Sequence, residues 1–285
     1  MSALSIERLP DLHDPIVVVA FSGWNDAANS ATDAAKFVVK RLGARRFASL
    51  DPEDFYDFQS SRPNVEMAGT NRVVGWPKNE FFYARNPVGP HDIVIGTGVE
   101  PGLAWGSFVA AHLELYSSLN PGLAVSLGAL LADVPHTRPT RVTGTAIDPD
   151  VAARLDLTTS RYEGPTGIVG VLHDALRRQG VAAASLWANV PHYITTSQNP
   201  MATAALLTRL QELAGLTFDL RELTQAAERF TNEIDTALFA SPEIAEYVRR
   251  LESQYDEGPQ EPEELPEGED VVLDVEAFLR QQRGQ

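Results

Sequence analysis

The chain of 285 residues contains no cysteine, which excludes several chemistries at once. Without thiols there is no disulfide bond, no cysteine-ligated zinc or iron-sulfur site and no thiol nucleophile. Long hydrophobic runs are also absent, and the apolar segment Ile16–Phe21 is far too short to span a bilayer. Residues 1–12 show neither the basic start nor the apolar stretch of a signal peptide. We therefore expect a cytoplasmic protein.

Positive charge is scarce as well. Lys and Arg number 23 against 39 Asp and Glu, which gives a formal net charge of -16 at pH 7. Such a field repels the phosphates of nucleic acids and anionic membranes, so we expect neither as a partner. Residues 256–270 hold eight acidic residues and no Lys or Arg, and they predict a solvated, flexible linker. The apolar residues 271–279 that follow predict a short segment that docks on its own protein or on a neighbour.

The tripeptide Val-Pro-His occurs twice, ending at His136 and at His192. Each copy follows a run of small and β-branched residues, Ala124–Asp133 or Ala182–Asn189, which is typical of a strand buried on both faces. Because a proline ends each strand, we expect both histidines just beyond the carboxyl edge of a parallel sheet, where ligand crevices form. The two strand ends predict one shared site. The alternative is that Pro-His is only a dipeptide that is favourable in loops.

Strand-like and helix-like segments alternate over the first 200 residues. With such long connections between strands, we expect an α/β fold of three layers, a mostly parallel sheet with helices on both faces. Asn71–Trp76 and Glu80–Arg85 predict a hairpin that extends one edge of this sheet. Two further predicted strands are Pro15–Phe21 and His91–Gly96. The predicted helices of this region are Asn25–Leu42, Leu103–Leu119 and Ile168–Gln179.

After residue 200 the pattern becomes helical. One helix ends at Gly215, and the next has apolar residues at alternating three and four spacings from Leu220 to Leu238. Ser241 and Pro242 predict the start of a further helix, as N-cap and first-turn residue. We expect a helical hairpin packed on the core, with a dedicated partner surface as the alternative. The expected organisation is an α/β core over residues 1–200, C-terminal helices over 201–255, an acidic linker over 256–270 and an apolar tail over 271–285.

Four strand ends carry residues able to do chemistry. Two carboxylates and two histidines, Asp26, Glu100, His136 and His192, suit zinc or manganese if the fold brings them together. Alternatively, the glycine-rich turn before Ile168 offers backbone N–H groups and a helix dipole to an anion. The residues expected to line a small-ligand or anion pocket are Gly23, Trp24, Asn25, Asp26, Glu100, His136, Arg138, Gly164, Thr166, Gly167, His192 and Tyr193.

Each of these residues also has a structural interpretation. Asp26 is in position to cap a helix, and Glu100 to accept a hydrogen bond from a loop amide. The glycine pattern matches neither the phosphate loop of nucleotide hydrolases nor a full dinucleotide fingerprint. Our prediction therefore includes no cofactor and no metal.

The same residues resemble a known family. The segments concerned are Ala20–Ala27, Gly98–Pro101 with Trp105, Val134–Pro139, Tyr162–Ile168 and Leu186–Tyr193 with Asn199 and Pro200. In this order they resemble the proteasome assembly chaperone family, in its actinobacterial branch, over residues 15–255. The resemblance implies a nucleoside-phosphorylase-like or hydrolase-like fold, homo-oligomers and, in archaeal and eukaryotic members, help in assembling the proteasome α ring. Members that grip the ring end in a hydrophobic-Tyr-x motif, whereas this sequence ends Arg283-Gly284-Gln285.

The leading hypothesis is a non-enzymatic, homo-oligomeric protein of the assembly-chaperone type, with proteasome subunits as candidate partners. We expect a homo-oligomer, because the helical hairpin and the edge hairpin offer apolar surface, and a trimer is the expected state. The alternative is a phosphorylase- or hydrolase-like enzyme, in which His136 and His192 act as acid-base groups while Glu100 and Asp26 orient them. A third hypothesis is an interaction module that works through its tail.

Overall fold

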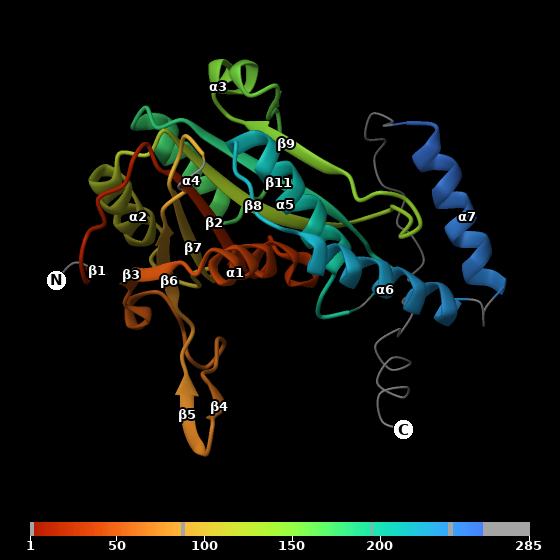
Figure 1. Ribbon diagram of the computed structural model, residues 1–285, viewed down its shortest axis with the longest axis horizontal. Coiled ribbons are helices and arrows are strands. Elements are labelled where there is room, and N and C mark those ends of the chain that lie inside the picture. Colours follow the sequence, from red (N-terminus) through yellow and green to blue (C-terminus); the bar gives the residue numbers. More distant parts are fainter. Residues whose placement is uncertain (1–2, 87–88, 195, 239–241, 259–285) are drawn as a thin grey trace.

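A computed structural model describes residues 3–86, 89–194, 196–238 and 242–258. Its centre is a nine-stranded sheet with the strand order β1-β3-β6-β7-β2-β8-β11-β9-β10 (Figure 1). The strands are β1 (Leu4–Ile6), β2 (Ile16–Ser22), β3 (Arg45–Leu50), β6 (Asn79–Ala84), β7 (Ile93–Val99), β8 (Leu123–Ala132), β9 (Val142–Ala146), β10 (Thr158–Thr159) and β11 (Ala183–Pro191).

The sheet is mixed, with a parallel centre. Strands β7, β2, β8 and β11 run parallel to one another, whereas β1, β3 and β6 form an antiparallel flank beside β7, and β9 lies antiparallel to β11. The connection from β6 to β7, residues 85–92, is too short for a parallel crossover. The α/β prediction is confirmed, but the sheet is parallel only at its centre and between the two end strands β9 and β10.

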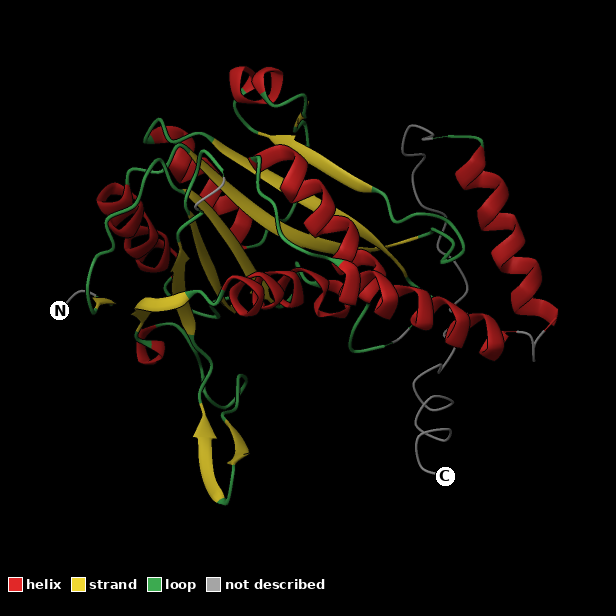
Figure 2. Ribbon diagram, viewed as in Figure 1, coloured by secondary structure: helices red, strands yellow, loops and turns green. Residues whose placement is uncertain are grey.

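Helices lie on both faces of the sheet (Figure 2). Helices α1 (Ser30–Leu42) and α5 (Pro200–Ala214) pack on one face, and α2 (Trp105–Leu119) and α4 (Ile168–Arg178) pack on the other. Strand β2 is buried on both faces, as expected for a central parallel strand. Its residues alternate between the two cores, with Ile16, Val18 and Ala20 in one and Val17, Val19 and Phe21 in the other.

Helix α1 begins later than the predicted start at Asn25. Ala28 and Asn29 both have φ 52°, in the left-handed region that a helix does not continue through. The chain therefore bends after β2 before the helix starts at Ser30. A further short helix, α3 (Pro149–Arg154), lies between β9 and β10.

The predicted hairpin over residues 71–85 is wrong. Strand β5 (Asn71–Gly75) pairs instead with β4 (Asn64–Ala68) in a separate two-stranded ribbon, which protrudes from the body (Figure 1). Gly69 takes φ 65° in the tight turn between β4 and β5, a conformation that favours glycine. Strand β6 joins the main sheet between β3 and β7.

The C-terminal part of the described chain is helical, as predicted. Helix α5 ends at Gly215, and α6 (Arg221–Leu238) and α7 (Pro242–Asp256) contact each other beyond the end of the sheet (Figure 1). Among the described residues, no helix is long and apolar enough to cross a membrane. The predicted N-cap Ser241, most of the acidic linker and the apolar tail lie outside the described residues.

Candidate functional site

The loops that follow β2 and β7 meet at Glu100. The two strands are parallel neighbours, so both loops leave the sheet at the same edge. The Glu100 carboxylate accepts hydrogen bonds from the Trp24 backbone N–H (3.3 Å), the Asn25 side-chain amide (3.2 Å) and the Ile168 backbone N–H (2.8 Å). Because Ile168 is the first residue of α4, this carboxylate lies at the positive end of the helix dipole. The helix N-terminus at which the sequence predicts an anion therefore holds the Glu100 carboxylate of the protein itself.

Close approach of the backbone makes this arrangement possible. A Cβ at Gly167 would lie 2.3 Å from the Asn25 amide nitrogen and 2.8 Å from Glu100 Oε1. Gly23, at φ 143°, lies against the same carboxylate, so both positions favour glycine. The other predicted residues of this region, Trp24, Gly164 and Thr166, are exposed. We call Gly23, Trp24, Asn25, Glu100, Gly167 and Ile168 the Glu100 cluster.

Asp26 holds the first turn of α1. Its buried carboxylate accepts hydrogen bonds from the Ala31 backbone N–H (2.7 Å) and the Thr32 hydroxyl (2.5 Å). Burial raises the pKa of Asp26, and these hydrogen bonds oppose the shift without cancelling it. The contacts are those of a residue that caps a helix, the structural interpretation considered for it from the sequence.

The two Val-Pro-His segments lie side by side, because β8 and β11 are parallel neighbours. The Tyr193 hydroxyl accepts a hydrogen bond from the His136 backbone N–H (2.8 Å) and lies 2.7 Å from Nδ1 of the same residue. Nε2 of His136 lies 3.0 Å from a carboxylate oxygen of Asp235 on α6. Burial lowers the pKa of His136, and Asp235 partly opposes that effect. Both nitrogens of this imidazole thus have a partner.

His192 extends the contact to α7. Its Nδ1 lies 3.0 Å from a carboxylate oxygen of Asp133, and its Nε2 lies 3.3 Å from the Tyr247 hydroxyl. The Tyr193 and Tyr247 rings meet edge to face, with ring centroids 5.9 Å apart. The second histidine therefore also joins the body to a C-terminal helix.

Arg138 adds charge to this contact. It forms ion pairs with Glu252 (3.0 Å) and Asp256 (2.8 Å) on α7, and the guanidinium lowers the pKa of Asp256. The neighbouring Arg141 stacks on the Tyr255 ring at 3.7 Å from its centroid. We call the whole set the helix clamp: His136, Arg138, His192 and Tyr193 of the body with Asp235, Tyr247, Glu252 and Asp256 of α6 and α7.

The four candidate acid-base groups are thus distributed over three places. Among the described residues, the Glu100 cluster and the helix clamp share no hydrogen-bonding partner, and Asp26 belongs to neither. Within the same part of the chain, no group of three or more His, Asp or Glu is placed to hold a metal ion. The arrangement organises loops and fixes helices to the sheet. The small-ligand pocket at these strand ends stays a prediction.

Sequence reasoning missed the half of the clamp that lies on the helices. One signal was available, because Glu252 and Asp256 are four positions apart and therefore share one face of α7. Nothing in that spacing identifies Arg138 as the cation opposite them. The pairing of His136 with Asp235 spans 99 positions and depends on the fold.

The sheet is mixed, and the loops at its carboxyl edge hold the helices α6 and α7. The molecule is therefore an α/β protein with a C-terminal helical extension that the helix clamp fixes to the body. The PAC2 family model matches residues 20–238, and the chain belongs to the PAC2 family. The resemblance seen in the sequence motifs is thereby confirmed. No curated protein matches the chain.

Several solved structures are similar to this one. A PAC2 family protein from Streptomyces avermitilis is 44% identical over 82% of this chain and 100% of that chain, with a TM-score of 0.77. A proteasome-assembly chaperone homologue from Mycobacterium tuberculosis is 40% identical over 82% of this chain and 99% of that chain, with a TM-score of 0.74. An archaeal proteasome activator from Pyrococcus furiosus is 20% identical over 82% and 97% of the two chains, with a TM-score of 0.66, and shares the fold.

Proposed function

We propose that this chain is a non-enzymatic, cytoplasmic protein of the assembly-chaperone type, which works by binding proteasome subunits. Its 40% identity to a proteasome-assembly chaperone homologue supports the proposal. The observation that carries it is the helix clamp. The two histidines best suited to acid-base catalysis, His136 and His192, are both engaged in holding α6 and α7 to the body.

The clamp gives such a protein a fixed, projecting surface for a partner. Ile244, Val248 and Leu251 on the inner face of α7 are buried, whereas Arg249 and Arg250 on its outer face are exposed. Neither arginine forms an ion pair within the described part of the chain, although the Arg250 guanidinium lies 5.0 Å from the centre of the Tyr247 ring, so both charges remain available to another protein. We therefore assign the partner contact to the outer face of α7.

We further propose that the protein acts as a homo-oligomer, with a trimer as the expected state. The β4–β5 ribbon supports this, because Val65 and Val74 lie opposite each other and are 52% and 53% exposed. Exposed apolar side chains on a protruding ribbon are typical of a contact surface. Light scattering coupled to size-exclusion chromatography should give three times the mass of one chain. The variant Val65→Asp with Val74→Asp should give a single chain, whereas a monomeric unaltered protein contradicts this part of the proposal.

The test of the main proposal is reconstitution of the proteasome from purified α and β subunits of the same organism. We expect the full chain to bind α-subunit intermediates and to accelerate the formation of complete particles, measured on native gels. Arg249→Glu with Arg250→Glu should weaken both effects. The matched control, Arg177→Glu with Arg178→Glu, reverses two exposed charges on α4 and should change neither.

Two outcomes contradict the proposal. One is the absence of any complex between the chain and the subunits, together with an unchanged rate of assembly. The other is equal loss of binding in both charge-reversal variants, which removes the assignment to α7. Circular dichroism of each variant checks that its helices are intact.

A further inference from the structure

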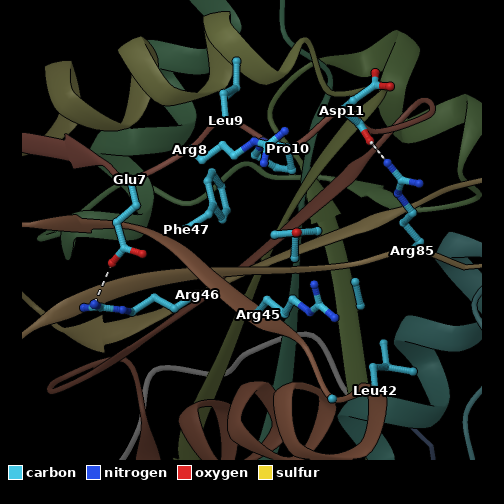
Figure 3. A pocket seen from close by; sticks show the side chains of 13 residues that line it. Glu7, Arg8, Leu9, Pro10, Asp11, Leu42, Arg45, Arg46, Phe47 and Arg85 are labelled. Carbon is cyan, nitrogen blue, oxygen red and sulfur yellow. Dashed lines mark hydrogen bonds and ion pairs between the residues drawn. The ribbon is translucent and has the colours of Figure 1, made fainter.

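An arginine-rich pocket lies between the N-terminal segment and strands β3 and β6, and it shares no residue with the helix clamp (Figure 3). Its volume is about 630 Å³, within the usual range of ligand pockets. Four guanidinium groups around one pocket are unexpected in a chain whose formal net charge is -16. The four residues are Arg8, Arg45, Arg46 and Arg85.

These arginines are not equally neutralised. Arg46 forms ion pairs with Glu7 (2.6 Å) and Glu80 (3.2 Å). Arg85 donates a hydrogen bond to the backbone carbonyl of Asp11 (3.1 Å), as Figure 3 shows. The guanidinium groups of Arg8 and Arg45 have no hydrogen bond or ion pair with any residue of the described part of the chain.

The unpaired charges of Arg8 and Arg45 define the chemistry that the pocket recognises. Guanidinium groups bind carboxylates through paired hydrogen bonds, and an anion that enters here needs to displace no competing carboxylate from these two arginines. Apolar surface is present in the same pocket, where Leu9 is 44% exposed and the Tyr83 ring is partly exposed. A peptide with several carboxylates and apolar neighbours matches this lining better than an isolated inorganic anion does.

Such a peptide is part of this chain. Residues 259–270 contain six acidic residues and no Lys or Arg, and the apolar residues 271–279 follow directly. The described structure ends at Gly258, and these twelve residues reach up to about 40 Å from there when extended. We propose that the arginine pocket binds the acidic segment 259–270, supplied by the same subunit or by a neighbouring one. This contact brings the apolar tail to the antiparallel end of the sheet, beside β1 and β3.

The absence of cysteine makes the contact directly measurable. In the full-length chain, Leu9→Cys places a thiol at the pocket and Leu265→Cys places one in the acidic segment, and a short bis-maleimide joins them. Denaturing gels separate a link within one chain from a link between two chains, which identifies the subunit that supplies the segment. We expect cross-linking about fivefold above that of a control pair, Ser117→Cys with Leu265→Cys, because binding raises the local concentration of the two thiols. Ser117 is exposed on α2.

Charge variants separate binding from chance collision. Arg8→Gln with Arg45→Gln should lower the cross-linking about fivefold, to the level of the Ser117 pair, because the charges that attract the segment are gone. Lys40→Gln with Arg62→Gln is the matched control, since it removes two exposed charges from a second hollow beside the β4–β5 ribbon. It should leave cross-linking unchanged. Cross-linking equal to that of the Ser117 pair, or insensitive to the Arg8 and Arg45 changes, overturns the proposal.

Discussion

Tyr193→Phe is the sharpest test of the helix clamp, because it removes one oxygen atom from a ring that is 1% exposed. That oxygen contacts both the backbone N–H and the imidazole of His136, which is 2% exposed. Each lost hydrogen bond costs about 0.5–1.5 kcal/mol, and each buried polar group left without a partner costs about 1–3 kcal/mol. With two groups affected and part of the cost counted in both figures, we expect a loss of about 2–4 kcal/mol in the free energy of unfolding.

The matched control is Tyr247→Phe. Its hydroxyl lies 3.3 Å from His192 and is only partly buried, so its loss should cost about 0.5 kcal/mol. Urea unfolding followed by circular dichroism measures both variants. Hydrogen exchange in α6 and α7 should accelerate in Tyr193→Phe before exchange in β2 does, because the damaged contact holds the helices.

One result would refute this reasoning. If Tyr193→Phe unfolds at the urea concentration of the unaltered protein, with the same exchange in α6 and α7, the polar clamp does not hold these helices. Their attachment would then rest on the apolar contacts of Ile234, Ile244, Val248 and Leu251 with the Tyr193 and Ile194 side chains.

Three further changes test other parts of the structure. Glu100→Gln should lower stability by about 0.5–1 kcal/mol in thermal melts, because it removes a charge from the N-terminus of α4. Gly128→Ala should lower the free energy of unfolding by about 1–3 kcal/mol, since its Cβ would lie 2.3 Å from the Trp187 ring. The loss should be smaller when the same change is made in a Trp187→Ala variant, which lacks the ring. Burial lowers the pKa of His173 to about 4, so the unfolded chain takes up a proton near pH 6.5 that the folded chain refuses. Stability should therefore fall by up to about 3 kcal/mol from pH 6.5 to pH 4, and His173→Gln should reduce this dependence in urea titrations.

Each of these expectations has a contrary result. If Glu100→Gln melts at or above the melting temperature of the unaltered protein, the charge of Glu100 does not stabilise the N-terminus of α4. Gly128→Ala costing the same with and without the Trp187 ring would show that the clash is not the cause. An acid sensitivity unchanged in His173→Gln would assign it to other groups.

The centre of the fold is predictable from sequence because its signals are local. Strands β2, β8 and β11 are apolar throughout most of their length, and α2, α4 and α5 show apolar faces with glycine or asparagine at or just beyond the helix end. Strand β4 was missed because all of its residues are exposed, so no burial pattern marks it. The antiparallel pairing of β6 with β7 was missed although the sequence carried a signal for it, because residues 85–92 are too few for a parallel crossover.

The candidate site was predictable only in its residue types. The Glu100 and Asp26 contacts match the structural interpretations drawn from the sequence, since both residues hold nearby backbone N–H groups. The histidines were placed correctly at the ends of β8 and β11. Their partners on α6 and α7 were not predictable, because hydrophobic periodicity places the buried face of a helix without identifying what lies opposite.

The strand order has a consequence for folding during synthesis on the ribosome. Strand β2 leaves the ribosome early, whereas its neighbours β7 and β8 are made much later. Strand β8 in turn pairs with β11, which ends at Pro191. At 5–20 residues per second, the interval between Ile16 and Pro191 lasts about 10–35 s. Both edges of β2 stay open until β7 has been made, and β8 then keeps one open edge until β11 follows, a condition in which nascent chains aggregate. In this PAC2 family protein, late segments of the chain therefore cover the apolar edges of strands that are made early.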